Sequence, residues 1–229
     1  VGGGSISQLE NHATFPDSPT VEKDAGYFEW PQSGDINVKP AGNVMDNYGV
    51  QMIGFLHPPA TGDYQFAIAS DDNSQLWLST DESPANAVMI ASQGGWQPVR
   101  DYRVETTSSE IFLEAGNVYF IELVIKEGGG GDNAAVAWSL PEDGPSDVEP
   151  GGLPISGDYL SPYFSVLDGE LSPILTSSGP VGAAIADTAS ISATFKNLGV
   201  AFTGVSVEVN GVAVEHTLAT DGGTTSITA

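Results

Sequence analysis

Apolar and polar residues alternate along much of this chain, and this period of two predicts β-strands. Gly and Pro interrupt the pattern at short intervals, and we find no convincing helix beyond short turns. The pattern therefore indicates an all-β fold, arranged as a mostly antiparallel sandwich. The expected strands are Gly49–Leu56, Asp63–Ser70, Gln75–Ser79, Ala87–Ala91, Glu110–Glu114, Val118–Lys126 and Ala134–Leu140.

One segment, Val118–Lys126, is apolar on both of its faces, with Glu122 as the polar exception inside it. Strands of this kind are buried on both sides, so we expect this one to lie at the centre of a sheet. Trp77, Tyr119 and Trp138 stand within strand patterns, and we expect them in the core.

The periodicity stops over residues 141–173 and resumes in a second β unit. We assign residues 1–166 to the sandwich, 167–175 to a linker and 176–229 to a partial immunoglobulin-like β domain. Asn210-Gly211 between two valine-rich runs is a strong signal for a two-residue hairpin, because both turn positions need positive φ. Aromatic residues such as Tyr159 and Tyr163 predict that the segment before the linker packs back onto the first domain.

The charge of the chain limits its partners. Six Lys and Arg face 30 Asp and Glu, which gives a formal net charge of −24. With so few basic residues the chain cannot neutralise many phosphates, so we do not expect it to bind nucleic acid. The acidity serves solubility alone, or it suits salty, calcium-rich surroundings. The chain has no Cys, and no apolar run approaches the length that crosses a bilayer, so we expect no membrane insertion.

Two loops about 55 residues apart carry the candidate chemistry. The first is the segment 70–73, Ser-Asp-Asp-Asn, and the second is the segment 126–133, Lys-Glu, four Gly and Asp-Asn. Calcium takes six to eight oxygen ligands from carboxylates and carbonyls, which these loops can supply together. The residues therefore predict one Ca²⁺ site at the open end of the sandwich, where two neighbouring hydroxyls of a sugar can complete the coordination.

Each element also has a simpler interpretation. Adjacent aspartates are common at solvated turns. A glycine run can simply be a flexible connection between two strands, although Gly also lets backbone carbonyls approach a metal. Trp96, in a Gly-Gly-Trp-Gln-Pro loop, either stacks on a sugar face or, in our preferred interpretation, is buried against the sandwich edge. Lys126 either contacts a ligand or neutralises the site, and we favour the structural role.

Catalytic signatures are scarce in this sequence. Its three His residues are scattered without metal-ligand spacing, and it has neither a Gly-x-Ser-x-Gly elbow nor a Cys nucleophile. Glycosidases use a pair of carboxylates, but among 30 acidic residues some pair can always be proposed, so such a pair is no evidence of catalysis. We therefore predict that the chain is not an enzyme.

Several motifs, in order, resemble the PA14 domain over about residues 10–165. The resemblance rests on the segments 46–49, 54–59, 61–66, 70–73, 76–79, 111–119, 132–133 and 137–138. It implies a jelly-roll-like β-sandwich and, in lectin-like members, two aspartates that are joined by a cis peptide and ligate calcium. By resemblance these are Asp71 and Asp72, and the second loop contributes Asp132 and the carbonyls of Gly129, Gly130 and Gly131.

The resulting hypothesis is a calcium-dependent carbohydrate-binding module for a glycan or polysaccharide. We expect it on the bacterial cell surface or outside the cell, in an adhesin or a polysaccharide-degrading enzyme, joined to other domains. Sugar contacts are expected at Asp71, Asp72, Asp132, Asn133 and Trp96. The alternative is a structural spacer or accessory domain whose calcium only rigidifies the loops.

Overall fold

A computed structural model describes residues 1–141, 148 and 151–163, and then the stretches 174–179, 192–196, 207–209, 212–215, 217–221 and 224–228. The chain forms two compact units, Val1–Tyr163 and Phe164–Ala229. No helix within these described residues is long and apolar enough to cross a membrane. The candidate site lies entirely in the first unit.

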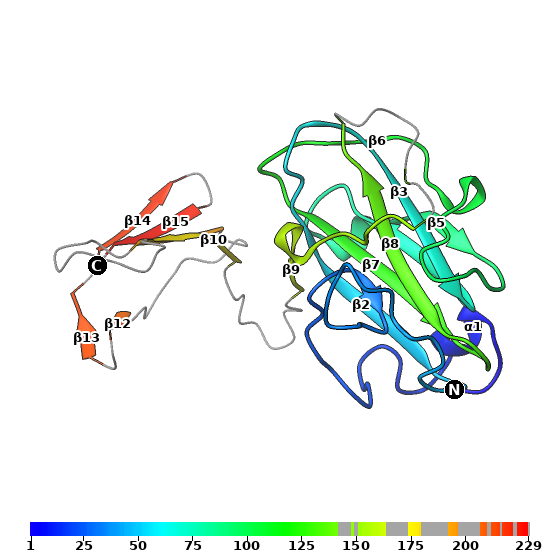
Figure 1. The fold of residues 1–229 in the computed structure, drawn as a ribbon. Helices are drawn as coiled ribbons and strands as arrows, with labels where there is room; N and C mark the ends of the chain where they lie inside the picture. Colours follow the sequence, from blue (N-terminus) through cyan, green and yellow to red (C-terminus); the bar gives the residue numbers. More distant parts are fainter. Residues whose placement is uncertain are drawn as a thin grey trace. The chain divides into compact units, whose positions relative to one another are not determined.

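The first unit is a sandwich of two antiparallel sheets with very little helix (Figure 1). One sheet has four strands in the order β1-β8-β3-β6, and the other has five in the order β5-β4-β7-β2-β9. The all-β prediction is therefore confirmed. The strands are β1 (Glu29–Trp30), β2 (Gly49–Leu56), β3 (Gly62–Asp71), β4 (Asn73–Leu78), β5 (Val88–Gln93), β6 (Ile111–Leu113), β7 (Tyr119–Lys126), β8 (Asn133–Ser139) and β9 (Leu160–Pro162).

Short helical segments lie between and before these strands. The α-helix α1 (Ile6–Glu10) precedes the first strand, and the 3₁₀ turns are η1 (Pro84–Asn86), η2 (Val104–Thr106) and η3 (Gly157–Tyr159). Helix α1 begins where Gln8 Oε1 accepts hydrogen bonds from the backbone N–H and the hydroxyl of Ser5, both at 3.0 Å.

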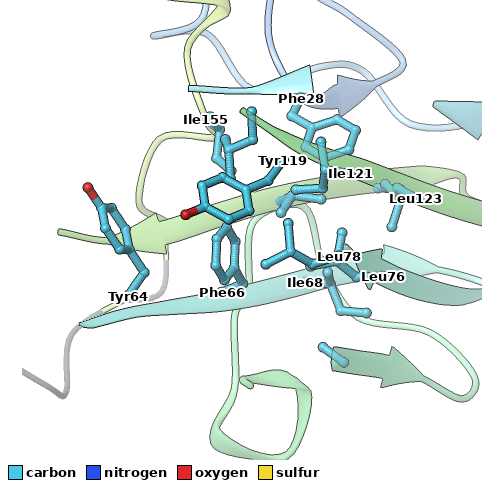
Figure 2. Close-up of a cluster of buried hydrophobic side chains, with 14 of the residues drawn as sticks. Phe28, Tyr64, Phe66, Ile68, Leu76, Leu78, Tyr119, Ile121, Leu123 and Ile155 are labelled. Carbon is cyan, nitrogen blue, oxygen red and sulfur yellow. The ribbon is translucent and has the colours of Figure 1, made fainter. Parts of the chain in front are cut away.

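The core lies between the two sheets. It is built from the side chains that point inward, which are every second residue along each strand (Figure 2). Strand β7 is its central strand, hydrogen-bonded to β4 on one side and β2 on the other. Its residues Tyr119, Ile121, Leu123 and Ile125 face this core. The labelled core side chains in the figure are Phe28, Tyr64, Phe66, Ile68, Leu76, Leu78, Tyr119, Ile121, Leu123 and Ile155.

The outer face of β7 is also covered, as its apolar pattern predicted. Val124 packs against Ile6 and Leu9 of α1. At the other end of the strand, the ring of Phe120 meets that of Tyr163 with centroids 5.0 Å apart. Burial on both faces explains why the residues on both faces of this segment are largely apolar.

The segment that precedes the second unit packs back onto the sandwich, as its aromatic residues predicted. Tyr159 meets Trp138 at 5.3 Å between ring centroids, and Tyr163 also meets Phe55 at 5.5 Å. Trp138 packs against the core, but Trp77 does not. Trp77 pairs with Glu122 across β4 and β7, on the outer face of the sheet, so its predicted place in the core is wrong.

The second unit contains a sheet with the order β10-β11-β15-β14 and a separate antiparallel pair, β12-β13. Its strands are β10 (Ile174–Gly179), β11 (Ser192–Lys196), β12 (Val207–Val209), β13 (Val212–Val214), β14 (Thr217–Asp221) and β15 (Thr224–Thr228). The pairing Val209↔Val212 agrees with the predicted hairpin. The turn residues 210–211 and most of the predicted linker 167–175 lie outside the described residues, and the immunoglobulin-like assignment stays a prediction.

Candidate metal centre

The two predicted loops meet at one end of the sandwich, where both connect one sheet to the other. Asp72 is the single residue that connects β3 of the four-stranded sheet to β4 of the five-stranded sheet. Residues 127–132 join β7 to β8 across the same gap. The register places Asp71 opposite Asn133 and Asn73 opposite Lys126. The strand pairing itself therefore brings the loops side by side.

Three carboxylates gather between these loops. One ligand oxygen from each of Asp71, Asp72 and Glu127 lies within 4.8 Å of the others. The peptide bond between Asp71 and Asp72 is cis, as the resemblance implies. Both aspartates are half-buried, whereas Glu127 is fully buried. The cluster is therefore closed on the side of Glu127 and accessible on the side of the aspartates.

Glu127 is the member of this cluster that the sequence analysis did not include among the candidate ligands. Both of its carboxylate oxygens are buried and have no hydrogen-bond partner among the described residues. Burial, and then the charges of Asp72 and Asp71, raise the pKa of Glu127 to about 7. A buried carboxylate without partners is costly unless a cation compensates it. In the sequence, its position directly before the glycine run was the feature that could have identified it as a candidate ligand.

The two aspartates differ in their surroundings. Burial and the neighbouring Asp72 raise the pKa of Asp71 to about 6. The Oδ2 atom of Asp72 accepts a hydrogen bond of 3.0 Å from the backbone N–H of Gly128. A Cβ added at Gly131 would stand 2.9 Å from Asp71 Oδ2, and one at Gly128 would stand 3.0 Å from Asp72 Oδ2. A side chain at either position would therefore displace the neighbouring carboxylate from its present place.

Lys126 is buried next to the cluster. Its Nζ donates a hydrogen bond to the backbone carbonyl of Glu127. Burial lowers the pKa of Lys126, while the charges of Glu127 and Asp72 act in the opposite direction. The ammonium offsets part of the negative charge from inside the protein, which agrees with the structural role that we favoured for it.

Asp132 was predicted as a metal ligand, and the structure gives its carboxylate other partners. Oδ1 accepts hydrogen bonds from the amides of Asn43 (2.6 Å) and Val44 (2.9 Å). Oδ2 accepts them from the amides of Val44 (2.9 Å) and Met45 (3.1 Å) and from the Tyr48 hydroxyl (2.9 Å). Asp132 thus anchors the 43–48 loop and lies outside the three-carboxylate cluster. Glu127 is the third carboxylate of that cluster, and metal coordination by Asp132 stays a prediction.

The glycine run lies against the 43–48 loop, and the amide of Gly130 donates to Asp46 Oδ1 at 3.2 Å. A Cβ at Gly129 would come 3.7 Å from the same carboxylate oxygen. The glycine loop is therefore packed between Asp46 on one side and Asp71 on the other. Metal coordination by the carbonyls of Gly129, Gly130 and Gly131 stays a prediction.

Trp96 projects from a loop that is tied to the first aspartate loop. The amide of Gly95 donates to Asn73 Oδ1 at 2.9 Å, and that of Gln97 donates to the carbonyl of Ser70 at 2.7 Å. Asn133 Nδ2 donates to the carbonyl of Gln97 at 3.1 Å. Trp96 itself is 67% exposed, so our preferred interpretation, burial against the sandwich edge, is wrong.

Asn133, predicted to contact sugar, is itself buried, and its amide braces the Trp96 loop. Its Oδ1 is buried without a partner among the described residues. Asp71 and Asp72 are the half-buried members of the acidic cluster, and the exposed Trp96 stands on a loop that is bonded to the neighbouring residues Ser70 and Asn73. Asp132 and Asn133 support the two loops that border the cluster.

Comparison with known proteins identifies relatives of this sandwich. The model of the PA14 domain family matches residues 8–152. A mouse (Mus musculus) enzyme, N-acetyl-beta-glucosaminyl-glycoprotein 4-beta-N-acetylgalactosaminyltransferase 1, is 35% identical over 147 residues, which are 59% of this chain and 13% of that enzyme. A sequence of this kind is thus part of a glycosyltransferase. This relative contradicts our prediction that the chain is not an enzyme.

The comparison with solved structures finds, among others, two domains of adhesins. The A domain of epithelial adhesin 6 from Candida glabrata, in complex with Galb1-3GlcNAc, has a TM-score of 0.40 and 20% identity, with 56% of each chain covered. The PA14 sugar-binding domain of an RTX adhesin has a TM-score of 0.37 and 19% identity, with 52% of this chain and 56% of that chain covered.

Proposed function

The chain belongs to the PA14 domain family, and from this premise we propose that its first unit binds carbohydrate through a calcium ion. Asp71, Asp72 and Glu127 would hold the ion, together with carbonyls of the segment 129–131. When bound, calcium would offer its remaining coordination positions to two neighbouring hydroxyls of a sugar.

The observation that carries this proposal is the buried carboxylate of Glu127, which has two orphaned oxygens and faces two further carboxylates. Three negative groups in such proximity repel one another, and Lys126 offsets only one charge. A divalent cation removes the repulsion and satisfies the buried oxygens at the same time. No hydrogen-bonding arrangement among the described residues does this.

The chemistry of the donor set favours calcium. All three side chains supply oxygen, and neither His nor Cys belongs to the cluster. Ligands at about 2.4 Å on opposite sides of one calcium ion are about 4.8 Å apart. The separation of the three oxygens, within 4.8 Å of one another, agrees with a single ion of this size.

The surroundings of the cluster suit a sugar. The half-buried aspartates leave the cluster accessible, and the exposed indole of Trp96 stands on a loop fixed to the same segment. Val44 and Met45, 52% and 54% exposed, lie on the loop that Asp132 anchors. Apolar surface beside a cation suits a sugar ring, which has an apolar face and a hydroxylated edge.

We further propose that the protein acts outside the cell or on the cell surface, as part of an adhesin or of an enzyme that acts on polysaccharide. Extracellular calcium modules bind the ion at about 10⁻⁴–10⁻³ M, and a site with few protein ligands needs such concentrations. The high negative charge also suits surroundings rich in counterions.

A glycan array tests the proposed function directly. The protein is applied in calcium and again in EDTA, beside the variants Asp72→Ala and Trp96→Ala. We expect glycan binding that EDTA and Asp72→Ala abolish. We also expect Trp96→Ala to weaken it without changing the melting temperature, because the indole is exposed. Calcium binding without any glycan signal would favour the structural spacer instead.

A further inference from the structure

Residues 1–4, which we call the N-terminal arm, are one Val and three Gly, and they lie across the loops that carry the candidate metal centre. The nitrogen of Val1 donates a hydrogen bond to the carbonyl of Asn47 at 2.7 Å. The side chain of Val1 also packs against the apolar cluster of Ile6, Leu9 and Val124, which holds α1 on β7. The arm is therefore fixed at both ends, by Val1 at its start and by α1 after it.

The middle of the arm packs against the glycine loop, beside the carboxylate of Asp72. A Cβ added at Gly128 would stand 3.6 Å from the Cα of Gly4 and 3.9 Å from the carbonyl oxygen of Gly3. The same Cβ would stand 3.0 Å from Asp72 Oδ2, which accepts the hydrogen bond from the amide of Gly128. A Cβ added at Gly4 would itself come 3.9 Å from Asp72 Oδ2. The arm thus lies against both partners of the hydrogen bond that holds this carboxylate.

Asn73 connects the arm to two further loops. It directly follows Asp72, and its Nδ2 donates a hydrogen bond to the carbonyl of Gly4. Its Oδ1 accepts a hydrogen bond from the amide of Gly95, in the loop that carries Trp96. Because one end of a side-chain amide donates and the other accepts, these two bonds together fix its orientation. One side chain therefore links the arm, the loop of the two aspartates and the Trp96 loop.

The path of the arm depends on one particular glycine. Gly3 has a φ of +81°, a left-handed conformation that residues with a Cβ rarely adopt. A Cβ at Gly3 would also stand 2.2 Å from Oε1 and Nε2 of Gln8. At Gly2 the φ angle is not positive, and an added Cβ would meet, apart from its chain neighbours, no heavy atom of the described residues within 4 Å. Ala is therefore compatible with the arm at position 2 and incompatible with it at position 3.

We propose that the N-terminal arm raises the cation affinity of the candidate metal centre by holding the loops around Asp72 in the arrangement that binds the ion. The inference rests on the proposed function, and it assigns a positioning role to residues outside the carboxylate cluster.

Two physical effects give the arm this role. The arm restricts Gly128 and Asn73, on the two loops that meet at Asp72, so less conformational freedom is lost when the ion binds. It also keeps water away from the hydrogen bond between Gly128 and Asp72, and electrostatic interactions are stronger where water is excluded. By thermodynamic linkage, an ion at the centre must hold the arm in place as strongly as the arm strengthens the binding of the ion.

Gly3→Ala loosens the arm, and Gly2→Ala is its matched control. Relaxation of backbone amides by NMR in EDTA shows whether Gly4 is rigid without any bound ion. We expect a rigid Gly4 in the wild-type protein and in Gly2→Ala, and a mobile one in Gly3→Ala. Calorimetric titration of calcium should give a Kd roughly five- to tenfold weaker for Gly3→Ala alone, at the lower end of usual coupling between sites. The melting temperature in EDTA should change by no more than about 4 °C, because the arm lies outside the core between the sheets.

Asn73→Ala removes the hydrogen bond to the arm from the other side and should weaken calcium binding about as much. The double variant with Gly3→Ala should lose less than the product of the two single losses, because both changes act through the same arm. Calcium affinity that stays unchanged when Gly4 becomes mobile, or losses that multiply in the double variant, would overturn the role of the arm alone. A Gly4 that is mobile in the wild-type protein, or rigid in Gly3→Ala, would overturn it as well. Wild-type protein that binds no calcium would overturn the proposed function itself.

Discussion

Replacing Glu127 by Gln removes one charge of the acidic cluster and keeps the size of the side chain. In the folded protein the pKa of Glu127 is raised from 4.5 to about 7. Between these two values the folded state holds a proton that the unfolded state has released. The stability that this carboxyl contributes is therefore complete below pH 4.5 and is lost as the pH rises through 7.

The size of the effect follows from the same two values. A pKa raised from 4.5 to about 7 corresponds to about 3 kcal/mol of unfolding free energy. Without calcium, Glu127→Gln should match the wild-type protein near pH 4.5 and exceed its stability by up to about 3 kcal/mol at pH 8. In calcium at 100 times the Kd of the wild-type protein, the difference at pH 8 should nearly disappear, because the wild-type protein binds the ion more tightly and gains about 2.7 kcal/mol.

Urea unfolding followed by tryptophan fluorescence at pH 5 and pH 8, in EDTA and in calcium, measures all four cases. All four tryptophans, Trp30, Trp77, Trp96 and Trp138, belong to the first unit, so the signal reports on the sandwich. If the difference in unfolding free energy between variant and wild type in EDTA were the same at both pH values, the raised pKa of Glu127 on which this prediction rests would be wrong.

Two other predictions concern the support of the site. Arg100 and Glu29 form a buried pair with bonds of 2.6 and 2.7 Å, so Arg100→Met should leave an unpaired charge and lower the unfolding free energy by about 3–5 kcal/mol. Arg103→Met, which breaks a more exposed pair, should cost at most about 1 kcal/mol in the same urea titration. Gly131→Ala places a Cβ 2.9 Å from Asp71 Oδ2 and should weaken calcium binding roughly tenfold by calorimetry, with the melting temperature in EDTA close to that of the wild type.

The sequence was informative where a local pattern determines the structure. Strand β2 spans Gly49–Leu56 as predicted, and the other six predicted strands lie within two residues of their observed ends. Their alternating residues are set by the period of the strand itself. Strands β1 and β9, with two and three residues, are too short to show a period, and they form because β8 and β2 offer them partners.

The site was less predictable, because distant parts of the chain decide which acidic side chain faces it. Asp132 and Glu127 both flank the glycine run, and neither local sequence tells which turns inward. The amides of residues 43–45 hold Asp132, and they are almost 90 residues away. Trp96 is exposed for a similar reason, since bonds from its loop to Ser70 and Asn73 fix its direction. Such contacts become visible only in the folded structure.

Calorimetric titration of calcium in 150 mM KCl tests the central claim most directly, because the salt screens weak binding to the acidic surface. We predict one site in the wild-type protein, its loss in Asp71→Ala and Asp72→Ala, and its retention in Asp63→Ala, which changes an aspartate at the opposite end of β3. Calcium affinity that is unchanged in both Asp71→Ala and Asp72→Ala would contradict the account.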